Sequence, residues 1–114
     1  MGISLTGFAE QTVTLKMDGE GAKGSPVTLS ASLTATPCAA GDPFVGFLSN
    51  APRGGFAGVQ VGGFVKASYT GTAPTPGYAV LAADGNGGVQ AASSGQARLI
   101  LEVDTTQQTV GFLL

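Results

Sequence analysis

The chain has 114 residues, of which 43% are hydrophobic and only 11% are charged, and its net charge is −2. This length allows one modest hydrophobic core and no more than one domain. Ordinary soluble domains carry roughly 25% charged residues, so the deficit predicts a weakly solvated surface that is partly covered by other subunits.

Two classes of partner are disfavoured by the same composition. Nucleic acids are bound through clustered Lys and Arg, whereas the five basic residues of this acidic chain are scattered. A membrane-spanning helix needs about 18 consecutive apolar residues, and no apolar run approaches that length. We therefore expect neither nucleic acid nor a membrane as the partner.

Residues 1–10 are predicted to form an N-terminal arm. Ile3, Leu5 and Phe8 are apolar but follow no sustained period. Such a terminal segment either frays or docks on a neighbouring subunit. We expect residues 11–114 to form a single β-barrel domain.

Two strands are predicted next. Residues 11–17 alternate between apolar and polar, and residues 26–32 do the same, which predicts strands with one buried face. Val13, Leu15 and Met17 are expected to face inward in the first strand, and Val27, Leu29 and Ala31 are expected to share one face of the second.

The segments that flank the second predicted strand are expected to be loops. Residues 18–25 contain a literal Gly-x-Gly-x-x-Gly pattern, but a strand rather than a helix follows. A dinucleotide site needs that helix, so a hairpin loop is the better interpretation. Residues 33–40 include Pro37 and are predicted to be rich in turns.

Residues 41–69 form the stretch around which the fold is predicted to be organised. A Gly-Asp-Pro turn leads into the apolar residues 44–48, and a polar loop follows at residues 49–55. Residues 56–69 read as one long strand with alternating side chains. Gly62 and Gly63 interrupt it, which predicts a bulge or sharp bend.

The last third of the chain reads as short strands separated by turns. A Gly-rich hairpin turn at residues 84–88 is the clearest of these turns. Leu99, Leu101 and Val103 are expected to share one face of their strand. The predicted strands of this region span residues 78–83, 89–92, 98–103 and 109–114.

The predicted fold class is all-β, because no segment shows helical periodicity over three turns. We expect a small barrel or sandwich of about eight short, mostly antiparallel strands joined by Gly- and Pro-rich loops.

The sequence offers little chemistry. It contains no His, and Cys38 is the only cysteine, which predicts a half-buried structural thiol. Asp84 and Asn86 have the spacing of two calcium ligands but lack the carboxylate that would complete a site. Glu102 and Asp104 are expected on a solvated strand face. We therefore expect no catalytic, cofactor-binding or metal-binding residues, and not an enzyme.

Several features together resemble a known family. They are the Gly-Ser-Pro-Val strand at residues 24–27, the Gly-Asp turn before Val45-Gly46-Phe47, the alternating residues 59–65, the Gly-Tyr-Ala-Val-Leu strand at residues 77–81, and the ending at residues 97–101 and 109–114. Over about nine tenths of its length the chain resembles the small β-barrel capsid cement (head decoration) proteins of tailed bacteriophages.

The resemblance implies a structural virion protein that binds the outer surface of a phage head. Such a protein stabilises the capsid by bridging major capsid subunits, carries no cofactor and forms a homo-oligomer, with a trimer favoured. It would be found on the outer capsid surface of the virion, and in the host cytoplasm during assembly.

Two segments are the expected contacts to the capsid or to sister subunits. The first is the arm, through Ile3, Leu5 and Phe8, and the second is the loop that carries the following residues: Asn50, Pro52, Arg53 and Phe56.

The alternative is a ligand- or glycan-binding β-module of a phage or cell-surface assembly. Sugar-binding platforms favour exposed aromatic residues. This chain has two Tyr and no Trp, which disfavours that alternative.

Overall fold

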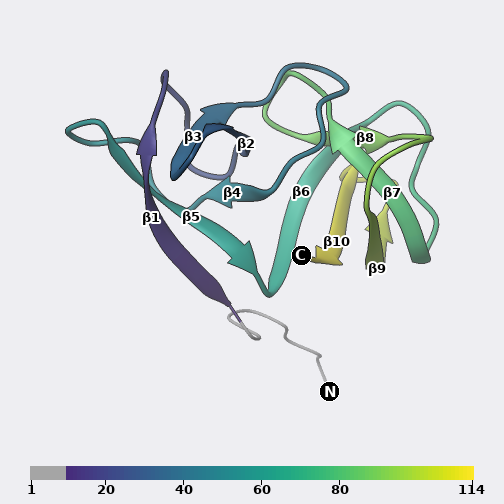
Figure 1. Ribbon diagram of the computed structural model, residues 1–114. Helices are drawn as coiled ribbons and strands as arrows, with labels where there is room; N and C mark the ends of the chain where they lie inside the picture. The colour runs from purple at the N-terminus through teal and green to yellow at the C-terminus, as the bar shows by residue number, and fades with distance from the viewer. Residues whose placement is uncertain (1–9) are drawn as a thin grey trace.

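The computed structural model describes residues 10–114 and contains ten β-strands, so the predicted all-β class is confirmed (Figure 1). The strands number ten rather than about eight, and they form two small closed barrels rather than one. The first barrel contains β1 (Gln11–Met17), β2 (Pro26–Ala31), β3 (Thr34–Pro37), β4 (Gly46–Leu48) and β5 (Phe56–Gly62). The second contains β6 (Phe64–Thr70), β7 (Gly77–Ala83), β8 (Val89–Ala91), β9 (Ala97–Asp104) and β10 (Thr109–Leu113).

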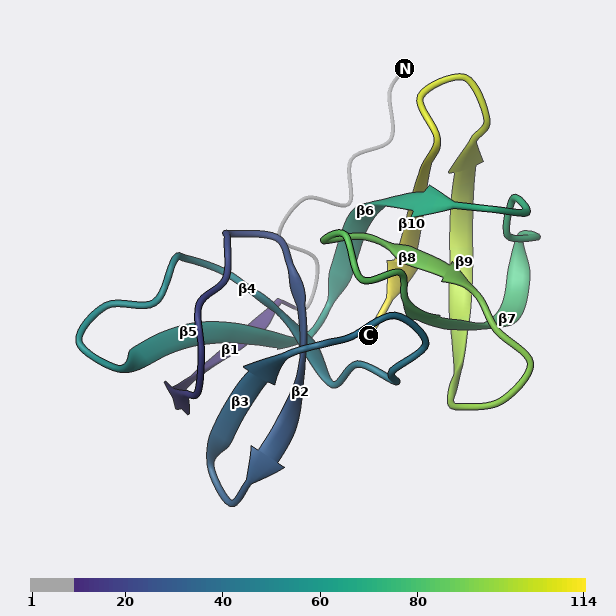
Figure 2. The same cartoon turned by 90° about the horizontal axis from the view of Figure 1, so that it is seen from above.

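The two barrels have the same topology. Around the first the strand order is β1-β3-β2-β4-β5, and around the second it is β6-β8-β7-β9-β10. In each barrel the first and third strands pair in parallel, and the remaining neighbours pair antiparallel. Figure 2 shows the first five strands grouped on one side of the molecule and the last five on the other. The fold is therefore a tandem duplication of one five-stranded unit.

Equivalent positions also fill the two cores. Six inward-facing residues of the first barrel correspond, by strand pairing, to six of the second, and all twelve are buried. The corresponding pairs are Met17 and Tyr69, Ala35 and Val89, Val27 and Leu81, Leu48 and Ile100, Ala57 and Val110, and Val59 and Phe112. The second member of most pairs is larger, so the second barrel has the bulkier core.

The predicted long strand at residues 56–69 is divided, which corrects the prediction. Gly63 has a φ of +90°, a conformation that glycine adopts without steric cost, and it turns the chain from β5 into β6. The predicted alternation is otherwise confirmed for Ala57, Val59, Val65 and the following odd-numbered residues to Tyr69, which are buried, but it is wrong for Val61, which is 36% exposed. The glycines thus join two barrels rather than bend one strand.

Two other local predictions were wrong. Residues 33–40 were expected to lack a strand, but β3 lies within them and follows a tight hairpin in which Leu33 has a φ of +54°. In β9 it is Ile100, 2% exposed, that enters the core, whereas Leu101 is 41% exposed. A register shift between β9 and β10 moves the strand out of simple alternation there.

The predicted inward faces of β1 and β2 are only partly buried. Met17 and Val27 lie in the core, and Leu15 packs against it. Val13 is 41% exposed and Leu29 is 50% exposed. Val13 and Leu29 therefore lie outside the core of the first barrel.

A segment of the first barrel completes the core of the second. Phe44 and Phe47, from the connection between β3 and β4 and from β4 itself, are 3% exposed and belong to the core cluster of the second barrel. Their rings lie 5.9 and 5.8 Å from the Phe112 ring. The two barrels therefore share apolar packing and are held together by it.

Candidate functional site

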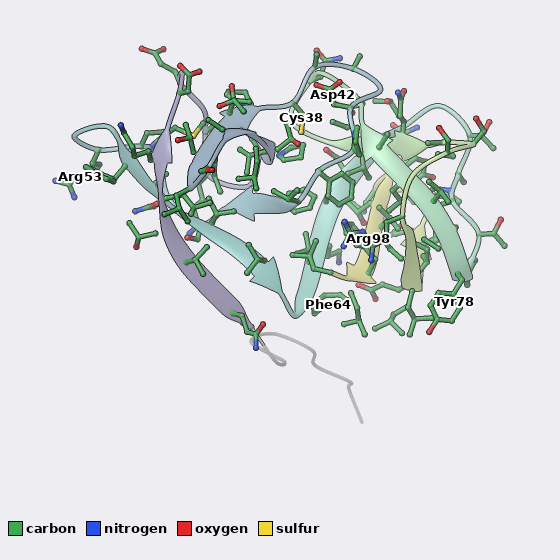
Figure 3. All side chains as sticks on the ribbon, viewed as in Figure 1. Cys38, Asp42, Arg53, Phe64, Tyr78 and Arg98 are labelled. Carbon is green, nitrogen blue, oxygen red and sulfur yellow. The ribbon has the colours of Figure 1, made fainter. Side chains whose placement is uncertain are left out.

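Four of the predicted contact residues lie together in the hairpin between β4 and β5. Arg53 and Phe56 exchange two backbone hydrogen bonds, of 2.8 and 3.1 Å, across the turn of the hairpin. Gly54 and Gly55 are the two central residues of this turn, and their φ values of +60° and +83° are those of a type I′ turn. Figure 3 shows Arg53 at the extremity of the molecule, directed away from the barrels.

The base of this hairpin is fixed by Asn50. Its Oδ1 accepts a hydrogen bond of 2.8 Å from the backbone N–H of Gly58, and the N–H of Ser49 donates to the Gly58 carbonyl oxygen at 2.9 Å. A Cβ at position 58 would lie 2.6 Å from Ser49 Oγ, so glycine allows this close approach without displacing the Ser49 side chain. Asn50 thus positions the loop, and its side-chain Oδ1 is occupied by the hydrogen bond from Gly58.

The tip presents an aromatic ring beside two cations. Phe56 is 52% exposed. Lys16 lies opposite it in the pairing of β1 with β5, and Arg53 is its partner across the turn. Both cationic side chains belong to exposed residues, whereas Pro52 is half-buried. We call Lys16, Arg53 and Phe56 the hairpin tip; its chemistry suits a partner surface that is apolar and acidic.

The other predicted contact residues, Ile3, Leu5 and Phe8, lie outside the described residues. Their contact role stays a prediction.

Sequence reasoning missed a second exposed aromatic residue. Tyr78 of β7 is 78% exposed, although its strand reads as compact and apolar. It borders an open depression of about 220 Å³ that Arg98, Leu99 and Leu113 also line. Figure 3 places Tyr78 on the far side of the molecule from Arg53. The alternation of side chains along β7 could have identified Tyr78 as exposed, since it lies on the opposite face of the strand from the buried Leu81 and Ala83.

The polar groups with possible chemistry have structural partners. Asp84 Oδ1 accepts hydrogen bonds from the N–H groups of Asn86 at 2.7 Å and Gly88 at 3.0 Å, and so stabilises the Gly-rich turn. Glu102 forms a surface ion pair of 3.7 Å with Lys66. Burial, and secondarily the carboxylate of Asp42, raises the pKa of the Cys38 thiol to about 11, which opposes the reactive thiolate form.

Residues 10–114 contain no group of three or more Cys, Asp or Glu side chains that could hold a metal ion. Over the same range, no helix is long and apolar enough to cross a membrane. Neither the known protein families nor the curated protein sequences contain a match to this chain.

Proposed function

We propose that this chain is a structural virion protein that binds the outer surface of a phage head and stabilises the capsid by bridging major capsid subunits. The observation that carries the proposal is the amount of apolar side chain left exposed on a sparsely charged surface. Leu33 is 73% exposed and Tyr78 is 78% exposed, on different barrels. Eight large apolar side chains among residues 10–114 are at least 36% exposed, and this number on a sparsely charged surface favours coverage by protein partners.

The duplicated fold suits a bridging role. A bridge needs two contact surfaces on one rigid body, so that binding to one subunit fixes the position of the next. The hairpin tip of the first barrel and the Tyr78 depression of the second provide two such surfaces on opposite sides of the molecule (Figure 3). The shared packing of Phe44 and Phe112 keeps them at a constant separation.

The hairpin tip is the proposed anchor to a capsid subunit. Aromatic and Arg side chains carry most of the binding energy in protein interfaces. The type I′ turn fixes the backbone of Arg53 and Phe56, so little backbone entropy is lost when they bind. A homo-oligomer, with a trimer favoured, would multiply these anchors on the capsid surface.

Mass spectrometry of purified phage particles tests the proposal. A fixed copy number relative to the major capsid protein is expected. Absence of the chain from particles would contradict the proposal and favour a search for soluble ligands.

Binding of the purified chain to undecorated heads tests the anchor. Replacing Arg53 and Phe56 together by Ser is expected to weaken binding, because both anchors are lost. Lys66→Ser is the matched control, since it removes an exposed cation of the second barrel. Equal binding by both variants would remove the hairpin tip from the interface.

A further inference from the structure

The two barrels differ at one strand edge. In the second barrel, β9 pairs only with the first half of β7, from Gly77 to Val80. The connection between β3 and β4 occupies the rest of that edge. The N–H of Gly41 donates to the Ala83 carbonyl oxygen at 2.8 Å, and the N–H of Ala83 donates to the Asp42 carbonyl oxygen at 2.9 Å. The edge of β7 is therefore closed by a segment of the first barrel.

The corresponding edge of the first barrel belongs to β2. Here β4 pairs only with Pro26 and Val27, and the last contact is the hydrogen bond of 2.9 Å from the Val45 N–H to the Val27 carbonyl oxygen. The connection then leaves for the second barrel, where Phe44 is buried. The same segment cannot fill both edges, so beyond Val27 the edge of β2 stays open.

Leu29 carries the hydrogen-bonding groups of this open edge. It lies opposite Ala35, just as Ala83 lies opposite Val89 in the second barrel. Its N–H and C=O are therefore directed away from β3, as those of Ala83 are. Within residues 10–114, no backbone hydrogen bond reaches Leu29 from the open side.

The side chains along the open edge are apolar or small. Leu29 is 50% exposed, and Leu33 in the adjoining hairpin is 73% exposed, whereas the equivalent Ala83 is fully buried. An exposed edge with free N–H and C=O groups and apolar side chains is a template for an added strand. β2, with the sequence PVTLSA, carries no charge.

We propose that the open edge of β2, from Thr28 to Ala31, binds the N-terminal residues 3–8 of a second copy of the chain as an added strand. These residues read Ile-Ser-Leu-Thr-Gly-Phe. They are uncharged like β2, and Ile3 and Leu5 have the spacing that places two apolar side chains on one face of a strand. Phe8 ends the segment, and its aromatic ring is large enough to cover the exposed Leu29 side chain.

Chain length indicates that a Phe8 side chain lying over Leu29 belongs to a second copy. Phe8 is three residues from Gln11, a reach of about 10 Å. Gln11 begins β1 and Met17 ends it, about 20 Å away. Leu29 lies at the Met17 end, because it pairs with Ala35, which pairs with Met17. Phe8 therefore falls short of the β2 edge of its own chain.

Exchange of arms in this way gives a head-to-tail contact, which closes into a ring when the rotation between copies allows it. A ring of three would be the trimer included in the proposed function. The inference itself concerns contacts between copies and stands without the capsid role, because purified protein is sufficient to test it.

Disulfide trapping between two singly labelled proteins tests the exchange. Both carry Cys38→Ser; one adds Phe8→Cys and a mass tag, and the other adds Leu29→Cys. After mixing under mild oxidation, the mixed disulfide is expected several-fold in excess of that formed with a Leu101→Cys partner. Leu101 is a matched control, since it is 41% exposed and lies in the second barrel. Equal yields with the two partners would overturn the proposal.

Sedimentation of the full-length chain provides the second test. The wild-type chain is expected above the 11.2 kDa of one copy, and Leu5→Asp is expected to fall toward that mass. Sedimentation of the wild-type chain as a single copy at every concentration would also overturn the proposal. If Leu5→Asp retains binding to phage heads while losing self-association, arm exchange and capsid binding are separate properties.

Discussion

Arg98 of β9 donates a hydrogen bond of 3.0 Å from Nη2 to the carbonyl oxygen of Phe44, and its guanidinium lies 5.0 Å from the centre of the Phe44 ring. This contact joins a strand of the second barrel to a connection of the first. Burial lowers the pKa of Arg98, but a guanidinium remains charged at neutral pH. The pair therefore combines a charge-assisted hydrogen bond with a cation–π contact at the junction of the two barrels.

Arg98→Ala is expected to destabilise the protein by about 2 kcal/mol. The change leaves the partly buried Phe44 carbonyl oxygen without its donor and removes the cation–π contact. Urea unfolding followed by far-UV circular dichroism measures the change. Lys66→Ala is the control: its ion pair with Glu102 is more than half exposed, so its loss is expected to cost less than about 0.5 kcal/mol. Equal costs for the two variants would contradict a structural role for Arg98.

The two barrels are expected to unfold in one transition, because Phe44 and Phe47 from the first are buried in the core of the second. Tyrosine fluorescence reports only the second barrel, since Tyr69 and Tyr78 are the two tyrosines and there is no Trp. Far-UV circular dichroism reports both barrels. The two signals are expected to change at the same urea concentration.

Phe112→Ala is the variant that probes this coupling. Phe112 is fully buried and packs against both Phe44 and Phe47, so its loss is expected to cost about 3–5 kcal/mol. If fluorescence shifts to lower urea while much of the circular dichroism change stays at the wild-type midpoint, the barrels unfold independently.

Local patterns explain which parts of the fold were predictable. The bounds of β1 and the turn at residues 84–88 follow from alternation and turn chemistry within a few residues. The duplication was not predictable in this way. Equivalent core positions carry different side chains, such as Met17 and Tyr69, and the equivalence lies in strand pairing between distant residues.

The same distinction applies to the candidate sites. Arg53 and Phe56 come together because a two-residue turn is a local structure, so the sequence was sufficient to group them. The open edge of β2 depends on the path of a connection that crosses to the other barrel. No property of β2 itself predicts that residues 41–44 pack elsewhere.

Asn50→Ala is expected to loosen the hairpin without touching its tip. The change leaves the Gly58 N–H without its acceptor and is expected to cost about 1 kcal/mol. Faster hydrogen exchange at residues 50–56 is the measurement, with residues 109–113 as an internal reference. If exchange in the hairpin is unchanged, the Asn50 side chain does not hold it in place.

The Cys38 thiol gives the protein a pH-dependent stability. Its pKa is raised from 9.0 to about 11, first by burial and then by Asp42. The unfolded chain therefore loses the thiol proton at a lower pH than the folded chain does. The stabilisation is fully present below pH 9 and is lost as the pH rises toward 11.

Comparison with Cys38→Ser isolates this contribution from the titration of Lys and Tyr, which both proteins share. The unfolding free energy of the wild-type chain relative to Cys38→Ser is expected to be constant below pH 9 and to fall between pH 9 and 11. Asp42→Asn removes the second cause, so in that background the fall is expected to begin at the same pH but to end at lower pH and to be smaller. A difference that stays constant up to pH 11 would mean that the folded and unfolded chains bind the Cys38 proton equally well.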